Sequence, residues 1–90
     1  KMREVIETNI YKKDFKKSIK QNKDINKLFI VLEKLIMDIK LEPKYKDHQL
    51  KGELKEYREC HIEPDWLLVY MKKDNKIFLA GLGSHSDLFK

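Results

Sequence analysis

The sequence predicts an α+β fold in which a helical hairpin packs on a mainly antiparallel four-stranded sheet, in the order β-α-α-β-β-β. Two observations support this prediction. Residues 9–39 show the 3.6-residue apolar periodicity of amphipathic helices, and residues 55–82 change to alternating, β-prone runs. The chain has 90 residues, which is the size of one domain, so we expect residues 1–90 to form a single domain around one core.

The N-terminal part is expected to form a strand followed by a helix. The strand covers residues 3–8, and Thr8 or Asn9 has a side chain suited to cap a helix over residues 10–21. The apolar residues of this helix recur every fourth position and are expected to form one buried stripe: Tyr11, Phe15 and Ile19. Lysines cover most of its remaining surface, which is typical of a solvated face.

The second helix has the clearest periodicity in the chain. It is expected to begin after Asp24, which can cap it, and Pro43 prevents it from continuing. Its apolar residues share one face: Ile25, Leu28, Phe29, Leu32, Leu35, Ile36 and Ile39. Because the turn before Asp24 is short, the two helices are expected to form a hairpin.

The second half of the chain is expected to contribute a polar loop and three strands. The loop covers residues 40–54, and the strands cover residues 55–62, 66–72 and 77–82. The middle run is apolar on both faces, which predicts a strand in the interior of the sheet.

Composition and charge limit the classes of function. The longest apolar run has six residues, 66–71, whereas a membrane-spanning helix needs roughly 20. The single cysteine, Cys60, cannot form an intramolecular disulfide and favours a reducing cytosol, so we expect a cytoplasmic protein.

The net charge of +5 is concentrated in residues 1–45, with 12 Lys and Arg against 7 Asp and Glu. This excess favours an anionic partner, either nucleic acid or an acidic protein, over a membrane.

Strand order predicts where the titratable residues meet. In a meander, the end of the 55–62 strand lies beside the start of the next strand and the exit of the last one. His61, Asp65 and His85 are therefore expected to converge at one edge, and the loop carrying His48 is long enough to reach them. Two imidazoles on either side of a phosphodiester can act as base and acid in RNA cleavage. In the alternative interpretation, each histidine is a solvated surface residue.

Several further residues are candidates for RNA contacts. Cations able to hold phosphate, and aromatic rings able to stack on bases, are Lys46, Lys51, Arg58, Trp66 and Phe89. The competing interpretation of Trp66 is a core residue, because it starts an apolar strand. A zinc site is not favoured, since the histidines lack the close pair spacing of metal ligands, so neither a metal nor another cofactor is expected.

Three stretches of the sequence resemble the YafQ-type toxins of the RelE/ParE superfamily of bacterial toxin–antitoxin modules. They are residues 45–52 (YKDHQLKG), residues 57–70 with Glu-Pro-Asp-Trp inside, and residues 82–89 (LGSHSDLF). The resemblance implies a RelE-like fold and a metal-independent endoribonuclease that cleaves mRNA, in most such toxins on the ribosome, by attack of the 2′-hydroxyl. It also implies a cognate antitoxin as partner, and operator DNA as a target of the toxin–antitoxin complex only.

The resemblance also assigns site residues. The functional positions of the family fall on His48, His61, Asp65, His85 and Phe89, with Trp66 alongside and Glu59 implicated in some relatives. One position departs from the pattern, because many relatives carry Arg where this chain has Gly81. The departure implies an enzyme that lacks one phosphate-contacting cation and is therefore attenuated.

Two non-enzymatic functions remain as alternatives. The same superfamily includes toxins that poison gyrase without cutting RNA, and Gly81 is compatible with such a role. The other alternative is a regulator that only binds an acidic antitoxin. The three histidines favour the nuclease.

Overall fold

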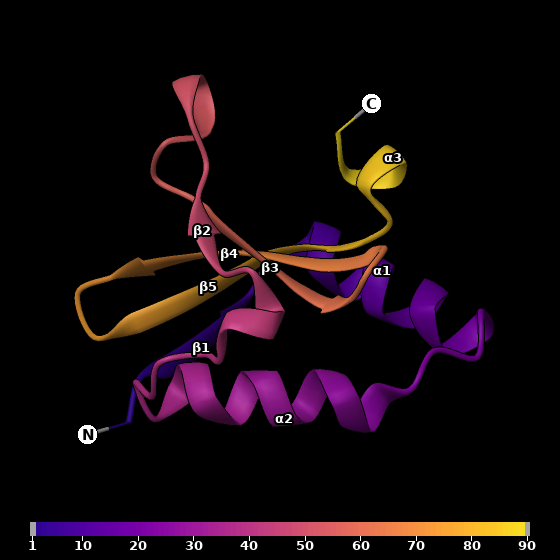
Figure 1. The fold of residues 1–90 in the computed structure, drawn as a ribbon, viewed down its shortest axis with the longest axis horizontal. Helices are drawn as coiled ribbons and strands as arrows, with labels where there is room; N and C mark the ends of the chain where they lie inside the picture. Colours follow the sequence, from indigo (N-terminus) through magenta and orange to yellow (C-terminus); the bar gives the residue numbers. More distant parts are fainter. Residues whose placement is uncertain (1, 90) are drawn as a thin grey trace.

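The computed structural model describes residues 2–89 and has the α+β class that the sequence predicts (Figure 1). Its elements are β1 (Glu4–Glu7), α1 (Asn9–Lys20), α2 (Ile25–Ile36), the 3₁₀ turn η1 (Pro43–Tyr45), β2 (His48–Gln49), the 3₁₀ turn η2 (Gly52–Leu54), β3 (Arg58–Glu63), β4 (Trp66–Lys73), β5 (Lys76–Gly83) and α3 (His85–Leu88). The described residues contain one sheet, of order β1-β5-β4-β3-β2, in which only β1 and β5 are parallel. The sheet therefore has one strand more than predicted.

The additional strand, β2, lies inside the stretch predicted to be a loop. It has only two residues, too few to produce an alternating pattern that a sequence can show. The following strand begins at Arg58 rather than at Lys55, because η2 and its exit occupy residues 52–57. The predicted interior strand is confirmed, since β4 lies between β5 and β3.

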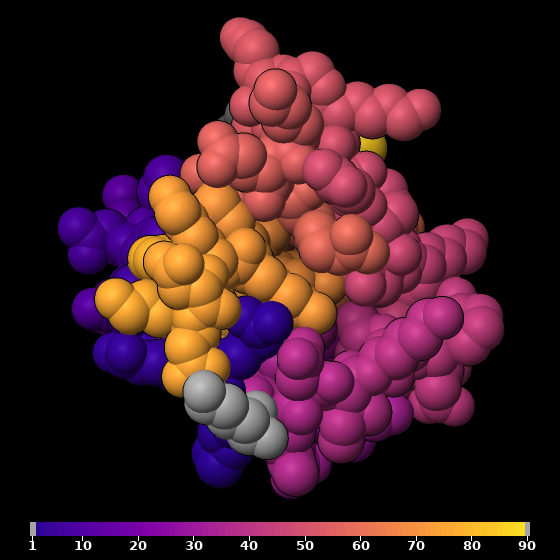
Figure 2. Space-filling model, turned by 90° about the vertical axis from the view of Figure 1, so that its left-hand side faces the viewer, coloured from indigo at the N-terminus to yellow at the C-terminus, as the bar shows by residue number. Residues whose placement is uncertain are grey.

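The two faces of the sheet are covered by different elements. α2 lies along one face, whereas α3 and the connection that contains η2 rise from the other (Figure 1). We call this second face, which carries Glu59, His61 and Val69, the α3 face. A view turned by 90° shows the η2 connection standing out from the body of the protein (Figure 2). The core lies on the α2 side, where alternate residues of β3, β4 and β5 pack against both helices.

The buried stripe of α1 differs from the predicted one. Thr8 caps the helix and Tyr11 is buried, as expected, but Ile19 is 50% exposed and Ser18 takes its place. Helix geometry explains the difference. Ser18 is seven residues after Tyr11, so its direction around the helix axis differs from that of Tyr11 by only about 20°. Ile19 is eight residues after Tyr11, and its direction differs by about 80°. Ser18 is satisfied in the core because its Oγ accepts a hydrogen bond of 3.2 Å from Nε1 of Trp66.

The buried face of α2 is also narrower than predicted. Leu28 and Leu35 are buried as expected. The third fully buried residue of the helix is Val31, whereas Phe29, which was expected to be buried, is 52% exposed. The helix ends at Ile36, so Ile39 lies beyond it and is exposed.

The single cysteine is a core residue. Cys60 is fully buried on the α2 side of β3, between two residues that face the other way, Glu59 and His61. Burial raises the pKa of its thiol to about 12, so the thiol stays protonated at neutral pH. Cys60 therefore contributes packing and not a nucleophile.

Candidate active site

The register of the sheet places residues from four strands in one row on the α3 face. His48 of β2 pairs with Glu59 of β3, Glu59 pairs with Val69 of β4, and Val69 pairs with Gly81 of β5. Neighbouring strands lie about 4.8 Å apart, so the loop histidine and the strand carboxylate become direct neighbours. The next row contains His61, Leu67 and Gly83.

Glu59 joins two imidazoles. Glu59 is 5% exposed, and its Oε1 lies 3.5 Å from Nε2 of His48 and 3.7 Å from Nε2 of His61. The Nδ1 atoms face backbone carbonyls, at 2.7 Å from Lys46 and 3.2 Å from Pro64. A carbonyl oxygen only accepts hydrogen bonds, so each Nδ1 carries a hydrogen and each Nε2 is turned toward the shared carboxylate. A proton on either Nε2 would form a charge-assisted contact with Glu59.

Asp65 and His85 form the other side of the site. The backbone N–H of His85 donates a hydrogen bond of 3.0 Å to Oδ1 of Asp65, which ties the start of α3 to the turn between β3 and β4. The imidazole of His85 packs against Phe89, with ring centroids 5.1 Å apart. His61 and Gly83, two residues before His85, are separated by one strand, about 10 Å between backbones. The structure thus forms two groups from the predicted residues, His48 and His61 around Glu59, and Asp65 with the backbone of His85.

The residues predicted to contact RNA lie in different environments, and only some of them are near the histidines. Lys46 lines the same groove as His61, and Lys51 is exposed at the start of η2. Arg58 is not brought to the histidines, because its guanidinium donates a hydrogen bond of 3.0 Å to Oδ2 of Asp47. The expected stacking of a base on Trp66 is wrong: this ring is 1% exposed and packs in the core.

Asp47 is a site residue that the sequence analysis missed. Its Oδ1 accepts a short hydrogen bond from the hydroxyl of Tyr70, and its Oδ2 accepts the one from Arg58. Tyr70 is fully buried, and burial raises the pKa of its hydroxyl far above the usual value. Asp47 therefore anchors the segment that carries His48 to the core. The available signal was Tyr70 itself, because a tyrosine in an apolar strand needs a partner for its hydroxyl.

Among residues 2–89, no group of three or more His, Cys, Asp or Glu side chains is arranged to hold a metal ion. No helix within the same residues is both long and apolar enough to cross a membrane.

Comparisons with known proteins agree on one family. Residues 3–90 match the family described as bacterial toxin of type II toxin–antitoxin system, YafQ. The mRNA interferase toxin YafQ of Escherichia coli K12 is 42% identical over 80 residues, which cover 88% of this chain and 87% of that protein.

Solved structures of similar proteins have the same fold. A copper-bound mutant toxin from Helicobacter pylori superposes with a TM-score of 0.95 at 42% identity, covering 98% of this chain and all of that one. A chain of the E. coli DinJ–YafQ toxin–antitoxin complex superposes with a TM-score of 0.92 at 38% identity, covering all of both chains.

Proposed function

Because this chain belongs to the YafQ family of bacterial type II toxin–antitoxin toxins, we propose that it cuts mRNA on the α3 face of its sheet. The chain is an mRNA interferase, that is, an endoribonuclease. The observation that carries the proposed site is the contact of Glu59 with Nε2 of both His48 and His61, while Gly83, two residues before His85, lies one strand away from His61. In this proposal these groups supply proton donors and acceptors on two sides of the scissile phosphodiester.

The proposed reaction is a transesterification within the RNA. One side of the site removes the proton of the 2′-hydroxyl, and the 2′-oxygen attacks the adjacent phosphorus. The bond from phosphorus to the 5′-oxygen breaks, and the other side of the site gives that oxygen a proton. The products are a 2′,3′-cyclic phosphate and a 5′-hydroxyl end, so the step is balanced without a metal or cofactor.

Glu59 and the cations have separate roles in this proposal. Glu59 orients the Nε2 atoms of His48 and His61 and compensates the charge of a protonated ring. Lys46, beside His61, contributes positive charge that attracts the RNA backbone to the site. Phe89 packs on His85 and offers its ring to a base.

The partners follow from the family. As a type II toxin the chain pairs with a cognate antitoxin, and the E. coli relative has been solved in complex with the antitoxin DinJ. We propose mRNA on the translating ribosome as the substrate, since the basic first half suits ribosomal RNA. We also propose that operator DNA is bound by the toxin–antitoxin complex only, and that the protein acts in the cytoplasm.

Primer extension on mRNA from cells in which the chain is induced tests the function. Discrete cuts within coding sequences, absent when His61 is replaced by alanine, are expected. Intact messages together with DNA damage would instead identify a gyrase poison, and intact messages without damage would identify an antitoxin-binding regulator.

Gly81→Arg is expected to raise the cleavage rate. Gly81 lies in the row of His48 and Glu59, so an arginine there adds a cation to the side of the row opposite His48. A Cβ at this position would lie 3.0 Å from a terminal methyl of Leu88, which must shift by a few tenths of an ångström. One phosphate-contacting donor is worth on the order of 100-fold in rate. If Gly81→Arg gives the same growth arrest and the same single-turnover cleavage rate as the parent, the hypothesis that Gly81 attenuates the enzyme is refuted.

Asp47→Ala is expected to slow cleavage by about 10- to 100-fold, because the segment carrying His48 loses its anchor to Tyr70 and Arg58. Ser18→Ala is the matched control, since it also leaves a buried donor without its acceptor, the N–H of Trp66, at a cost of about 1–3 kcal/mol. If both variants unfold earlier but only Asp47→Ala loses kcat at a temperature where both are folded, Asp47 is a positioning residue. Equal kcat values would make its role purely structural.

A further inference from the structure

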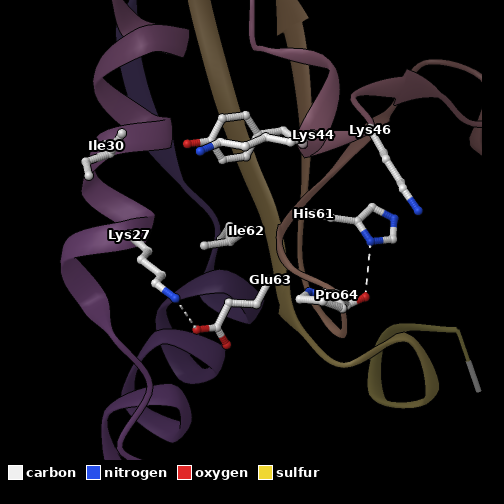
Figure 3. Close-up of a pocket in the computed structure, with 9 residues that line it drawn as sticks. Lys27, Ile30, Lys44, Lys46, His61, Ile62, Glu63 and Pro64 are labelled. Carbon is white, nitrogen blue, oxygen red and sulfur yellow. Dashed lines mark hydrogen bonds and ion pairs between the residues drawn. The ribbon is translucent and has the colours of Figure 1, made fainter.

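A groove of about 540 Å³ begins at His61 and runs between α2 and η1 (Figure 3). Lys27 and Ile30 of α2 form one wall, and the other wall comes from η1 and the residue after it. Ile62 and the turn after β3 close its base. The groove is therefore continuous with one of the imidazoles of the candidate active site.

The groove has an excess of positive charge, because three lysines line it and it contains only one carboxylate, that of Glu63. Lys27, Lys44 and Lys46 line it together with Glu63, which already pairs with Lys27 at 3.1 Å and with Lys23 at 3.7 Å. Lys44 and Lys46 form no ion pair within residues 2–89; Lys44 lies over the ring of Tyr45, 5.2 Å from its centroid. Both ammonium groups are thus available to an external anion.

Backbone conformation places Lys46 at the junction of groove and active site. This residue is left-handed, with φ 48°, and its carbonyl accepts the hydrogen bond from Nδ1 of His48. Its side chain extends from η1 toward the side of the groove where His61 lies (Figure 3). A phosphate held by Lys46 would therefore be near the imidazoles, and one held by Lys44 would be farther along the groove.

We propose that this groove, the α2–η1 groove, binds the RNA strand on one side of the cut, with Lys46 and Lys44 contacting the phosphates next to the scissile one. The inference rests on the proposed function and extends it to a second substrate-binding site. We assign RNA to the groove, and not a protein segment, because the groove begins at an imidazole of the candidate active site and its free groups are cations. The apolar hollow suited to a protein lies elsewhere on the chain, at Met2, Phe29, Leu32, Ile36 and Met37.

The test is binding of a fluorescent 2′-O-methyl oligoribonucleotide, which cannot be cleaved because its nucleophile is blocked, over a range of salt concentrations. Each phosphate contact on a single strand contributes about 0.7 to the slope of log K against log salt. Lys44→Gln/Lys46→Gln is expected to weaken binding and to lower that slope by about 1.4. Lys73→Gln/Lys76→Gln removes the same charge from two exposed residues that flank the β4–β5 turn. It is the matched control and should bind like the parent.

One further variant and one further binding partner separate this inference from the proposed function. His61→Ala is expected to abolish cleavage, whereas Lys73→Gln/Lys76→Gln is expected to cut mRNA like the parent. If the groove variant binds with the parental affinity and slope while the parent still cuts mRNA, the groove proposal is wrong and the function stands. If the groove variant loses affinity for the cognate antitoxin instead of RNA, the groove belongs to the protein partner and the proposal is equally overturned. If the parent cuts no RNA, the function fails, and the binding data still decide the groove.

Discussion

His85→Ala is expected to slow RNA cleavage by about 100- to 10,000-fold, the usual contribution of a positioned acid or base. The melting temperature should barely change. The imidazole is exposed on a four-residue helix, and the bond that ties this helix to Asp65 is made by the backbone N–H of His85, which alanine retains. Single-turnover cleavage of mRNA on programmed ribosomes, with thermal unfolding followed by circular dichroism, measures both quantities.

Ser86→Ala controls for damage to α3, because Ser86 is also exposed and lies next to His85. This variant should cleave at the parental rate. An equal loss in both variants would mean that disturbing the helix, and not removing the imidazole, slows the reaction. A parental rate in His85→Ala would remove that residue from the chemistry.

Glu59→Gln is expected to slow cleavage by about 100- to 1,000-fold. Glutamine keeps the size and burial of the side chain but removes the charge that faces Nε2 of His48 and Nε2 of His61. Stability should be unchanged or slightly higher, because a buried carboxylate carries a desolvation cost that a neutral amide lowers. The combination of lost rate and retained stability distinguishes a site residue from a core residue.

Glu4→Gln is the matched control for the same chemical change. Glu4 lies on β1, at the edge of the sheet farthest from β2 and His48, and is exposed. The control should cleave like the parent. The role of Glu59 would be contradicted if Glu59→Gln cleaved as fast as this control, or if its rate fell only in proportion to the fraction unfolded.

The arrangement of the active-site residues could be predicted to the extent that strand order determines it. The meander of β3, β4 and β5 brings His61 and His85 to one region of the sheet, because the end of β3 and the exit of β5 flank the same end of the central strand, where β4 begins. Alternation along β3 also makes it predictable that Glu59 and His61, two residues apart, share a face of the sheet. Both properties follow from the period of two in an extended chain.

The position of His48 could not be predicted from strand order or alternation. Its strand, β2, has two residues, and what holds it is a hydrogen bond between side chains far apart in the sequence, from Tyr70 to Asp47. No periodic pattern reports such a contact. The predicted stacking of a base on Trp66 was wrong for a related reason. The local sequence shows that a residue is apolar but not which element covers it. In the structure, α1 covers this ring through Ser18.

The central claim is that His48, Glu59 and His61 face a common phosphodiester with His85 on its other side. The most direct measurement is a structure of the chain bound to RNA whose scissile 2′-oxygen is methylated. The account predicts that the scissile phosphate or its flanking oxygens lie within about 3.2 Å of a ring nitrogen of His85 and of His48 or His61, with the next phosphate at Lys46. RNA that never reaches the α3 face, or a scissile phosphate out of reach of all three imidazoles, would contradict it.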